Sequence, residues 1–548
     1  MSWSIRSLFA SLLLAGLGAG AATRVRAQPA AAARPDAPLP RPTLVVFLTV
    51  DQMRADYLTT RFGSGLTGGL KRLRDGGALF TNAHQDHAIT ETAPGHATTL
   101  SGRFPSHTGI VRNATGVQDP QAPLLAGGVT GPASPFRFRG STLVDWMRSA
   151  DPRSRALSVS RKDRGAIFPM GRAKQHVFWY GGNGRFVTSR YYDDTLPDWV
   201  KRFDGDSAGG PLAPLGTIAA RYAGRAWTPL LAASAYPEPD SVPVENGGHD
   251  YTFPHVLTAN PAVAVRDLAE FPWMDEATLG FALAGVRALK LGAGPSPDVL
   301  AISLSTTDAI GHRYGPDSRE LHDQIIRLDR MLGAFFNSLY SVRDSSRIVV
   351  ALTADHGVAP FPELYTAQTH RRAGHVDASD LLHRARTTLV ERGIDSTALS
   401  FEDGMLFVRR ESFARAGFDA AAVIDPFVSA LRRRAGVLRV DRVRDLARDS
   451  ASNPISRRWL HMVSPDLPVE YVATLSPYSV WGSVTYAEHG TPHDYDTHVP
   501  VIFYGPPFRP GRYPEFARVV DMAPTLAWIA HVTPSDRLDG RVLRAAIR

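Results

Sequence analysis

Four continuous apolar runs dominate the hydrophobic pattern of this chain. They are rich in β-branched residues and cover residues 43–50, 298–305, 347–353 and 499–504. A run that is apolar at every position is typical of a strand buried on both faces, as in a parallel sheet covered by helices. We therefore predict that these runs form the core strands of one sheet.

Helical patterns alternate with these runs. We expect helices over 66–75, 141–149, 275–290 and 320–340, and a short strand over 156–160. The longest helical pattern carries a 3.6-residue apolar stripe through Leu321, Ile325, Leu328, Leu332, Phe335 and Leu339. Alternation of this kind predicts an α/β fold, a mostly parallel sheet with helices on both faces.

Two segments have a different character. Residues from about 170 to 255 are first aromatic and then rich in Gly and Pro. Residues 365–480 mix helical patterns (381–391 and 421–434) with strand patterns (405–408 and 469–475). We predict that both are insertions that leave the core and form a cap, so that residues 42–548 make one catalytic domain.

The first residues read as an export signal. Residues 1–27 combine Arg6, an apolar run over 8–22 and the small-x-small end Val25-Arg26-Ala27, which indicates a secretory signal peptide. The alternative is an N-terminal anchor, but the apolar run is short for a span. Residues 28–41 are an Ala/Pro-rich tether. No later stretch is long and apolar enough to cross a bilayer.

Composition narrows the chemistry. The chain has 548 residues, 44% apolar residues and no Cys, so any metal must be held by His and carboxylates. Removing the three arginines of residues 1–27 from the net charge of +8 leaves +5. This charge is small for the length and forms no basic stripe, so we do not expect nucleic-acid binding.

Three of the apolar runs are followed by an aspartate. Asp51, Asp308 and Asp355 should meet at the carboxyl edge of the sheet, where they would repel one another unless cations bind between them. His312 and His356 accompany two of them, and His489 precedes the last core run. Each Asp alone could be a helix N-cap, but the joint pattern predicts a metal site, and an O/N ligand set suits zinc.

A hydroxyl opens the next candidate element. In Glu91-Thr92-Ala93-Pro94-Gly95-His96, the proline fits a first helical turn, so Thr92 should lie at or just before a helix N-terminus. Such a position favours anions. Thr92 is either an N-cap or a nucleophile, and the cap is the more common role for a lone Thr.

Seven short motifs in this order resemble the alkaline phosphatase superfamily, and within it the phosphate-irrepressible periplasmic alkaline phosphatases, which are related to nucleotide pyrophosphatase/phosphodiesterases. The resemblance covers about residues 42–546 and implies an alkaline-phosphatase-like sandwich. The motifs are FLTVDQMRADYL (47–58), ETAPGHATTLSGRFPSHTGIVRN (91–113), SRKDRG (160–165), TTDAIGHRYGP (306–316), TADHG (353–357), HGTPHDYDTHVPVIFYG (489–505) and DMAPTLA (521–527).

The resemblance implies a role for each candidate residue. One zinc ion is expected on Asp308, His312 and His489, and a second on Asp51, Asp355 and His356, with Thr92 as a further ligand and as the nucleophile that forms a phosphothreonine. His493 and His498 are the alternatives to His489, which begins the His-Gly element of the family.

Donors to the phosphoryl oxygens are expected at Asn113, Lys162 and Arg164. The resemblance places an oxyanion contact at Asn113. A charged turn over 161–164 is more often solvated, but the chain has only five lysines and one stands here. Alternation along an extended segment would direct Lys162 and Arg164 to the same side.

This pair of cations favours a phosphate monoester, because a monoester dianion gains from two extra positive charges. We therefore expect a periplasmic or secreted phosphomonoesterase that is monomeric and acts on small-molecule monoesters. A phosphodiesterase, nucleotide pyrophosphatase or phosphonate hydrolase on the same site is the alternative. A sulfatase is disfavoured by the absence of Cys. A non-catalytic metal- or phosphate-binding protein is the third hypothesis.

Overall fold

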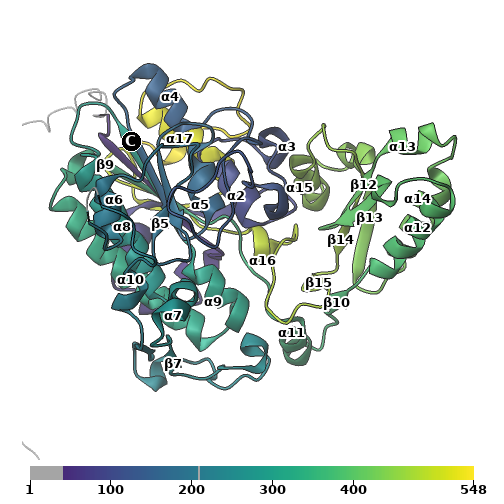
Figure 1. The fold of residues 1–548 in the computed structure, drawn as a ribbon, viewed down its shortest axis with the longest axis horizontal. Helices are drawn as coiled ribbons and strands as arrows, with labels where there is room; N and C mark the ends of the chain where they lie inside the picture. Colours follow the sequence, from purple (N-terminus) through teal and green to yellow (C-terminus); the bar gives the residue numbers. More distant parts are fainter. Residues whose placement is uncertain (1–40, 208–209) are drawn as a thin grey trace, which may run out of the picture. The chain divides into compact units, whose positions relative to one another are not determined.

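The computed structural model describes residues 41–207 and 210–548, so the predicted signal peptide and all but the last residue of the tether lie outside the described residues. A nine-stranded sheet with the order β17-β2-β16-β9-β1-β8-β3-β4-β5 forms the centre of the described chain (Figure 1). Helices α8 (Trp273–Ala288) and α10 (Arg319–Tyr340) pack on each other beside it, and α4 (Leu143–Ala150) packs on α17 (Met522–Ile529).

The three central strands are parallel and end at the same level. These strands are β8 (Asp298–Leu304), β1 (Leu44–Val50) and β9 (Ile348–Thr353). Val50 pairs with Leu304, and Thr49 pairs with Thr353. All residues of the three strands are buried, as their continuous apolar runs predicted. This register brings the residues that follow the strands to one edge of the sheet.

The expected fold class is confirmed. The pairs β1–β8, β1–β9, β3–β8, β3–β4 and β17–β2 are parallel, where β3 is Ala156–Ser160 and β4 is His176–Tyr180. The predicted last core strand, β16 (Val501–Tyr504), pairs antiparallel with β9 and with β2 (Ala78–His84). Strands β2 and β17 (Gly511–Arg518) were not predicted, because neither is a continuous apolar run.

The segment of about 170–255, expected to leave the core, contributes two strands to the main sheet. β4 pairs with β3, and β5 (Phe186–Val187) pairs with β4 at the edge. Phe178 and Trp199 both pack on Phe281 of α8. The aromatic residues here therefore build part of the core, and the irregular excursion begins only after β5.

Residues 365–480 contain a separate four-stranded sheet with the order β11-β12-β14-β13. Its strands are Leu399–Glu402, Met405–Val408, Val469–Leu475 and Val437–Arg442 in that order. Helices α12 (Ser379–Glu391) and α14 (Ala421–Arg432) cover it with an apolar cluster of their own. Trp459 and Met462 of α15 (Pro454–Met462) pack with Ala88 and Ile89, just upstream of Thr92.

No helix in residues 41–207 and 210–548 combines the length and the apolar character that a membrane span requires.

One glycine controls how closely the helix after Thr92 approaches the sheet. Helix α2 (Thr92–Thr99) packs against the turn that follows β9, and a Cβ at Gly95 would collide with the backbone carbonyl of Asp355. We expect Gly95→Ala to lower the free energy of unfolding by about 1–3 kcal/mol, because the helix must shift away from a packed backbone.

Urea unfolding of the purified variant measures this effect. Gly294→Ala is the matched control, since a Cβ at Gly294 meets no atom within 4 Å. Equal midpoints for the two variants would show that the close packing at Gly95 contributes nothing to stability.

Candidate active site

The three predicted aspartates meet at the carboxyl edge of the central strands. Asp51 follows β1, Asp355 follows β9, and Asp308 lies in the first turn of α9 (Thr306–Tyr314), which follows β8. Their exposed fractions are 0%, 0% and 4%. Burial and the neighbouring Asp308 and Asp355 carboxylates raise the pKa of Asp51, and Lys162 and His356 lower it, so that the pKa is about 6.

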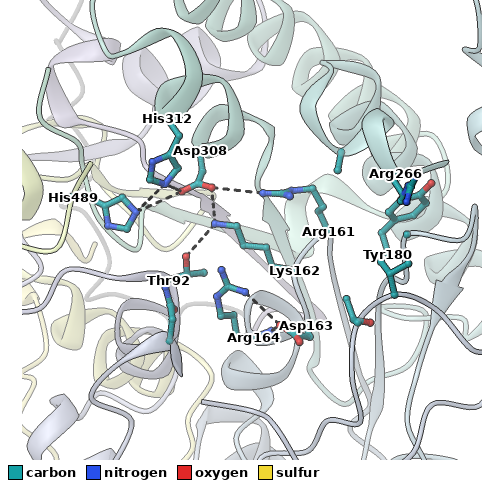
Figure 2. A pocket seen from close by; sticks show the side chains of 15 residues that line it. Thr92, Arg161, Lys162, Asp163, Arg164, Tyr180, Arg266, Asp308, His312 and His489 are labelled. Atoms are coloured by element: carbon teal, nitrogen blue, oxygen red, sulfur yellow. Dashed lines mark hydrogen bonds and ion pairs between the residues drawn. The ribbon is translucent and has the colours of Figure 1, made fainter. Parts of the chain in front are cut away.

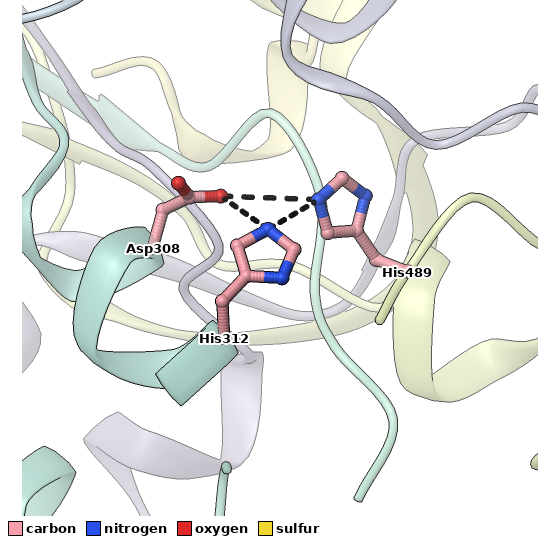
Figure 3. Close-up of side chains that lie close together, drawn as sticks. All are labelled: Asp308, His312 and His489. Carbon is pink, nitrogen blue, oxygen red and sulfur yellow. Dashed lines mark hydrogen bonds and ion pairs between the residues drawn. The ribbon is translucent and has the colours of Figure 1, made fainter. Parts of the chain in front are cut away.

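Two histidines gather around one oxygen of Asp308 (Figure 3). His312 Nε2 lies 3.4 Å and His489 Nε2 lies 3.8 Å from Asp308 Oδ1, and the two Nε2 atoms are 3.2 Å apart. Burial disfavours the charged form of His312, but Asp308 outweighs it and raises the pKa of His312 to about 9. Burial holds the pKa of His489 well below its ordinary value, and His356 and His312 lower it further.

A second group contains His356. Its Nε2 lies 3.5 Å from Asp51 Oδ1 and 3.6 Å from Asp355 Oδ2. Ligand atoms of Asp51, Asp308 and His356 lie within 4.8 Å of one another, as do those of Asp308, His312 and His489. Asp308 thus belongs to both groups. Asp355, which we expected with Asp51 and His356, is not in the second group, and its Oδ2 lies 3.0 Å from His96 Nδ1.

Backbone carbonyls orient all three imidazoles. His312 Nδ1 bonds to Ala487 O at 2.6 Å, His356 Nδ1 to Gly357 O at 3.0 Å, and His489 Nδ1 to Thr90 O at 2.7 Å. A carbonyl can only accept, so each Nδ1 carries a proton and each Nε2 is directed at the carboxylates. This arrangement of outer contacts is typical of metal-ligating histidines.

The donor set therefore fits divalent metal ions. Asp51 Oδ1 and His356 Nε2 are buried and have no hydrogen-bond partner in the described part of the chain. Such orphaned polar atoms are costly unless a cation or a proton satisfies them. Carboxylate oxygens and imidazole nitrogens without sulfur suit zinc among the common metals.

Thr92 is the first residue of α2, as predicted, and it is buried. The interpretation of Thr92 as an N-cap is wrong, because its hydroxyl makes no capping hydrogen bond and instead accepts one from Lys162 Nζ at 3.1 Å. Lys162 Nζ also lies 2.8 Å from Asp51 Oδ2 and 2.7 Å from Asp308 Oδ2 (Figure 2). The ammonium group of Lys162 thus lies between the Thr92 hydroxyl and the two carboxylates.

Asn113 performs the capping instead. Its Oδ1 accepts a hydrogen bond from the Ala93 N–H at 2.8 Å, and its own N–H donates to Glu91 Oε2 at 2.6 Å. The helix N-terminus engages the amide oxygen, so the amide nitrogen of Asn113, which lines the cavity, remains as a donor. Asn113 and Thr92 are therefore held on the same helix end.

The expectation of an extended segment at Lys162 and Arg164 is wrong. Asp163 begins a short helix, α5 (Asp163–Ile167), and Lys162 is the residue just before it. Both side chains nevertheless line the same cavity as Thr92. Strand β3 ends at Ser160, and the chain turns into the helix within two residues. A charged pattern of four residues does not reveal this change from strand to helix.

A cavity of about 460 Å³ opens at this site. It is lined by Thr92, Asn113, Lys162, Arg164, Asp308, His312 and His489 of the predicted residues, and also by Val129, Thr130, Arg161, Asp163, Tyr180, Gly182, Arg266 and Ala269. Asp51, Asp355 and His356 are not among the lining residues and are fully buried. A volume of this size accommodates a small organic ligand.

The two alternative histidines lie elsewhere. His493 Nε2 bonds to Leu475 O at 2.8 Å, and His498 Nε2 bonds to Thr81 O at 3.0 Å while its ring stacks on His84. Of the three candidates, only His489 joins the carboxylates in the described residues.

Sequence reasoning missed Gln52 and His96. Gln52 donates from its backbone N–H to Asp355 Oδ1 at 3.1 Å and from Nε2 to Asp308 Oδ1 at 3.3 Å, with a left-handed φ of 67°. His96 Nδ1 lies 2.9 Å from Thr92 O, and its Nε2 lies 2.8 Å from Ser303 Oγ. The spacing of His96 four residues after Thr92 was a signal, since helical residues at i and i+4 share a face.

Comparisons with known proteins found similar sequences over most of the chain. A family model described as type I phosphodiesterase / nucleotide pyrophosphatase matches residues 45–390. Alkaline phosphatase PafA of Elizabethkingia meningoseptica is 29% identical over 521 residues, covering 89% of this chain and 91% of that protein. Alkaline phosphatase PhoK of a Sphingomonas species is 31% identical over 541 residues, covering 92% and 91%.

A solved structure has the same fold. The crystal structure of wild-type alkaline phosphatase PafA superposes with a TM-score of 0.84 at 27% identity, covering 93% of this chain and 99% of that one.

His96 connects three parts of the site, so its removal should be costly. The side chain is fully buried and contacts Asp355, Ser303 and the carbonyl of Thr92. We expect His96→Ala to lower the free energy of unfolding by about 2–4 kcal/mol, because it leaves a cavity and unpaired buried polar groups.

Chemical denaturation checks this value. His107→Ala is the matched control, because His107 also pairs with an aspartate, Asp539, but its side chain is 52% exposed. A loss for His96→Ala no larger than that of His107→Ala would contradict a structural role for His96.

Proposed function

We propose that this chain, which belongs to the type I phosphodiesterase / nucleotide pyrophosphatase family and is an alkaline phosphatase, is exported and binds two zinc ions. In this proposal it is a phosphomonoesterase that acts through a phosphothreonine. The observation that carries this proposal is the contact of Lys162 with both the Thr92 hydroxyl and the buried carboxylates of Asp51 and Asp308. Thr92 and Lys162 line one cavity with His312 and His489. Export rests on the sequence of residues 1–27.

Six side chains and the nucleophile would hold the metals. We assign Asp308, His312 and His489 to one zinc ion, and Asp51, Asp355, His356 and the Thr92 oxygen to the other. Asp308 also lies within reach of the second group. When bound, the two ions supply Lewis acidity that favours the ionised hydroxyl of Thr92 and the charge of the leaving oxygen.

The protein's own groups then direct the reaction. Thr92 loses its hydroxyl proton to water, and its Oγ1 attacks phosphorus and forms the phosphothreonine. The P–O bond to the alcohol oxygen of the substrate breaks, and that oxygen departs with the bonding electrons and takes up a proton from water. Water then breaks the new P–O bond and restores the hydroxyl. Two inversions in sequence predict net retention of configuration at phosphorus.

Fixed donors surround the position of the transferred phosphoryl group. Asn113 and Lys162 hydrogen-bond to the first two residues of α2, Ala93 and Thr92 respectively, and both line the cavity together with Arg164. Such preorganised donors act most strongly on the charge of the transition state. The first N–H groups of α2 add a favourable field for an anion.

The cationic side chains of Lys162 and Arg164 support a monoester as substrate. A monoester dianion carries one more charge than a diester and gains more from Lys162 and Arg164. A phosphodiesterase, nucleotide pyrophosphatase or phosphonate hydrolase with the same metal ligands remains the alternative. A non-catalytic binding protein would need none of the alignment between Thr92 and the ligand groups.

Removing the nucleophile tests the mechanism. We expect Thr92→Ala to lower kcat on an aryl phosphate by at least about a thousandfold, whereas Thr92→Ser retains measurable turnover, because only the hydroxyl reacts. Steady-state assays measure both variants, and mass spectrometry of acid-quenched enzyme should find phosphate on the peptide that contains Thr92.

Chelation followed by zinc addition is the accompanying control, and activity should be lost and then recovered. A Thr92→Ala variant with wild-type turnover would rule out the covalent mechanism.

Removal of either Lys162 or Arg164 tests the substrate class. We expect Lys162→Ala and Arg164→Ala to lower kcat/KM for an aryl phosphate about tenfold to a hundredfold more than for the corresponding bis-aryl phosphate, because the dianion loses more stabilisation. Assays of both substrates with the same enzyme preparation give the comparison. Equal losses on the two substrates, or a wild-type preference for the diester, would favour the phosphodiesterase alternative.

A further inference from the structure

The cavity contains a cation that the proposed chemistry does not use. Four basic side chains line it, and three of them have an acidic neighbour. Lys162 pairs with Asp51 and Asp308, Arg161 NH2 lies 3.6 Å from Asp308 Oδ2, and Arg164 NH1 lies 3.6 Å from Asp163 Oδ1. Arg266 has no carboxylate within ion-pair distance anywhere in residues 41–207 and 210–548.

Neighbouring contacts fix the position of Arg266. It lies in the last turn of α7 (Pro261–Asp267), which begins at a cap where Asn260 Oδ1 accepts from the Ala262 N–H at 3.0 Å. The hydroxyl of Tyr180 donates to the carbonyl of Val265 at 2.6 Å. Tyr180 is the last residue of β4, so the main sheet itself holds the end of α7 beside the cavity.

Arg266 and Tyr180 stand away from the reactive end of the site. Figure 2 shows both on the opposite side of the cavity from Thr92, His312 and His489, with Arg161, Lys162 and Arg164 between. Val129 and Thr130 also line the cavity. A phosphoryl group held at Thr92 therefore leaves room in the same cavity for the rest of the substrate.

We propose that the Arg266 end of the cavity is a subsite for a second anionic group on the leaving portion of the substrate. The ligand is a phosphate monoester whose alcohol also carries a carboxylate or a second phosphate. Arginine matches both groups with two parallel N–H donors, and an arginine without an internal partner in a concave site retains its charge for an incoming anion. This inference rests on the proposed function, because it places the first phosphate at Thr92.

Two pairs of substrates test the subsite. 4-Carboxyphenyl phosphate and its neutral carboxamide differ in one charge, and propane-1,3-diol bisphosphate and propyl phosphate differ in one phosphate. We expect Arg266→Ala to lower kcat/KM for the charged member about threefold to tenfold more than for the neutral member, as for a partly exposed ion pair. Arg266→Lys should recover part of the difference, because it keeps the charge but not the fork.

Arg330→Ala is the matched control. Arg330 is also an exposed arginine on a helix, α10, and does not line the cavity, so its removal should leave both charged-to-neutral ratios unchanged. Comparison of the two substrate pairs identifies the anion: a change confined to the bisphosphate pair assigns the subsite to phosphate, and a change confined to the carboxyphenyl pair assigns it to carboxylate.

The outcomes separate this inference from the proposed function. Turnover of monoesters with equal losses on charged and neutral members would overturn the subsite alone. If the wild-type enzyme hydrolyses no monoester, calorimetry with propane-1,3-bisphosphonate and propylphosphonate decides. Tighter binding of the bisphosphonate that Arg266→Ala abolishes would uphold the anion subsite while the proposed function fails, and equal binding would overturn both.

Discussion

The repulsion among three buried carboxylates is the constraint on which the site depends. Parallel pairing in register brings Asp51, Asp308 and Asp355 to one edge of the sheet, and each is almost completely removed from water. Charges of one sign that are buried together are stable only beside compensating positive charge. The ammonium group of Lys162 supplies part of this positive charge, and the imidazoles of His312, His356 and His489 lie beside the carboxylates. The same charge balance that stabilises the fold at this edge thus creates a place for divalent cations.

The surrounding structure holds these groups in place at some conformational expense. Gln52 adopts a left-handed backbone so that its N–H can reach Asp355, and Gly95 allows α2 to touch the carbonyl of the same residue. His312 and His489 are each tied to a backbone carbonyl of a distant segment, and His356 is tied to that of its neighbour Gly357. The carbonyl of Thr90 places His489 next to the start of α2. Strain and close packing of this kind are common where a site must be preorganised. The hydroxyl of Thr92 is consequently aligned by the same contacts that orient the metal-ligand candidates.

The charge of the cavity changes from one end to the other. Near Thr92, every basic group is balanced by an aspartate, so the field there depends on what binds between them. At the α7 end, Arg266 has no such partner in the described chain, so its charge is available to an incoming anion. In the proposed function, different elements would recognise the dianionic phosphoryl group and a second anion of the substrate. α2 and α5 would hold the first, and α7, which Tyr180 of β4 fixes to the sheet, would hold the second.

The sequence by itself determined the central strands, the aspartates that follow them and the position of Thr92 at a helix start. These features depend on local periodicity and turn chemistry, which a single chain displays directly. Strands β2 and β17 could not be predicted, because their residues are stabilised by neighbouring strands rather than by an apolar run of their own. Only the tertiary structure decided that Lys162 lies between two carboxylates, that Arg164 stands on a helix, and that His489 rather than His493 or His498 meets Asp308. It alone also brought Arg266 into the cavity. Apart from the short helix at Arg164, each of these features joins residues far apart in the chain. The distance between such residues is set by the packing of whole elements, which no local pattern encodes.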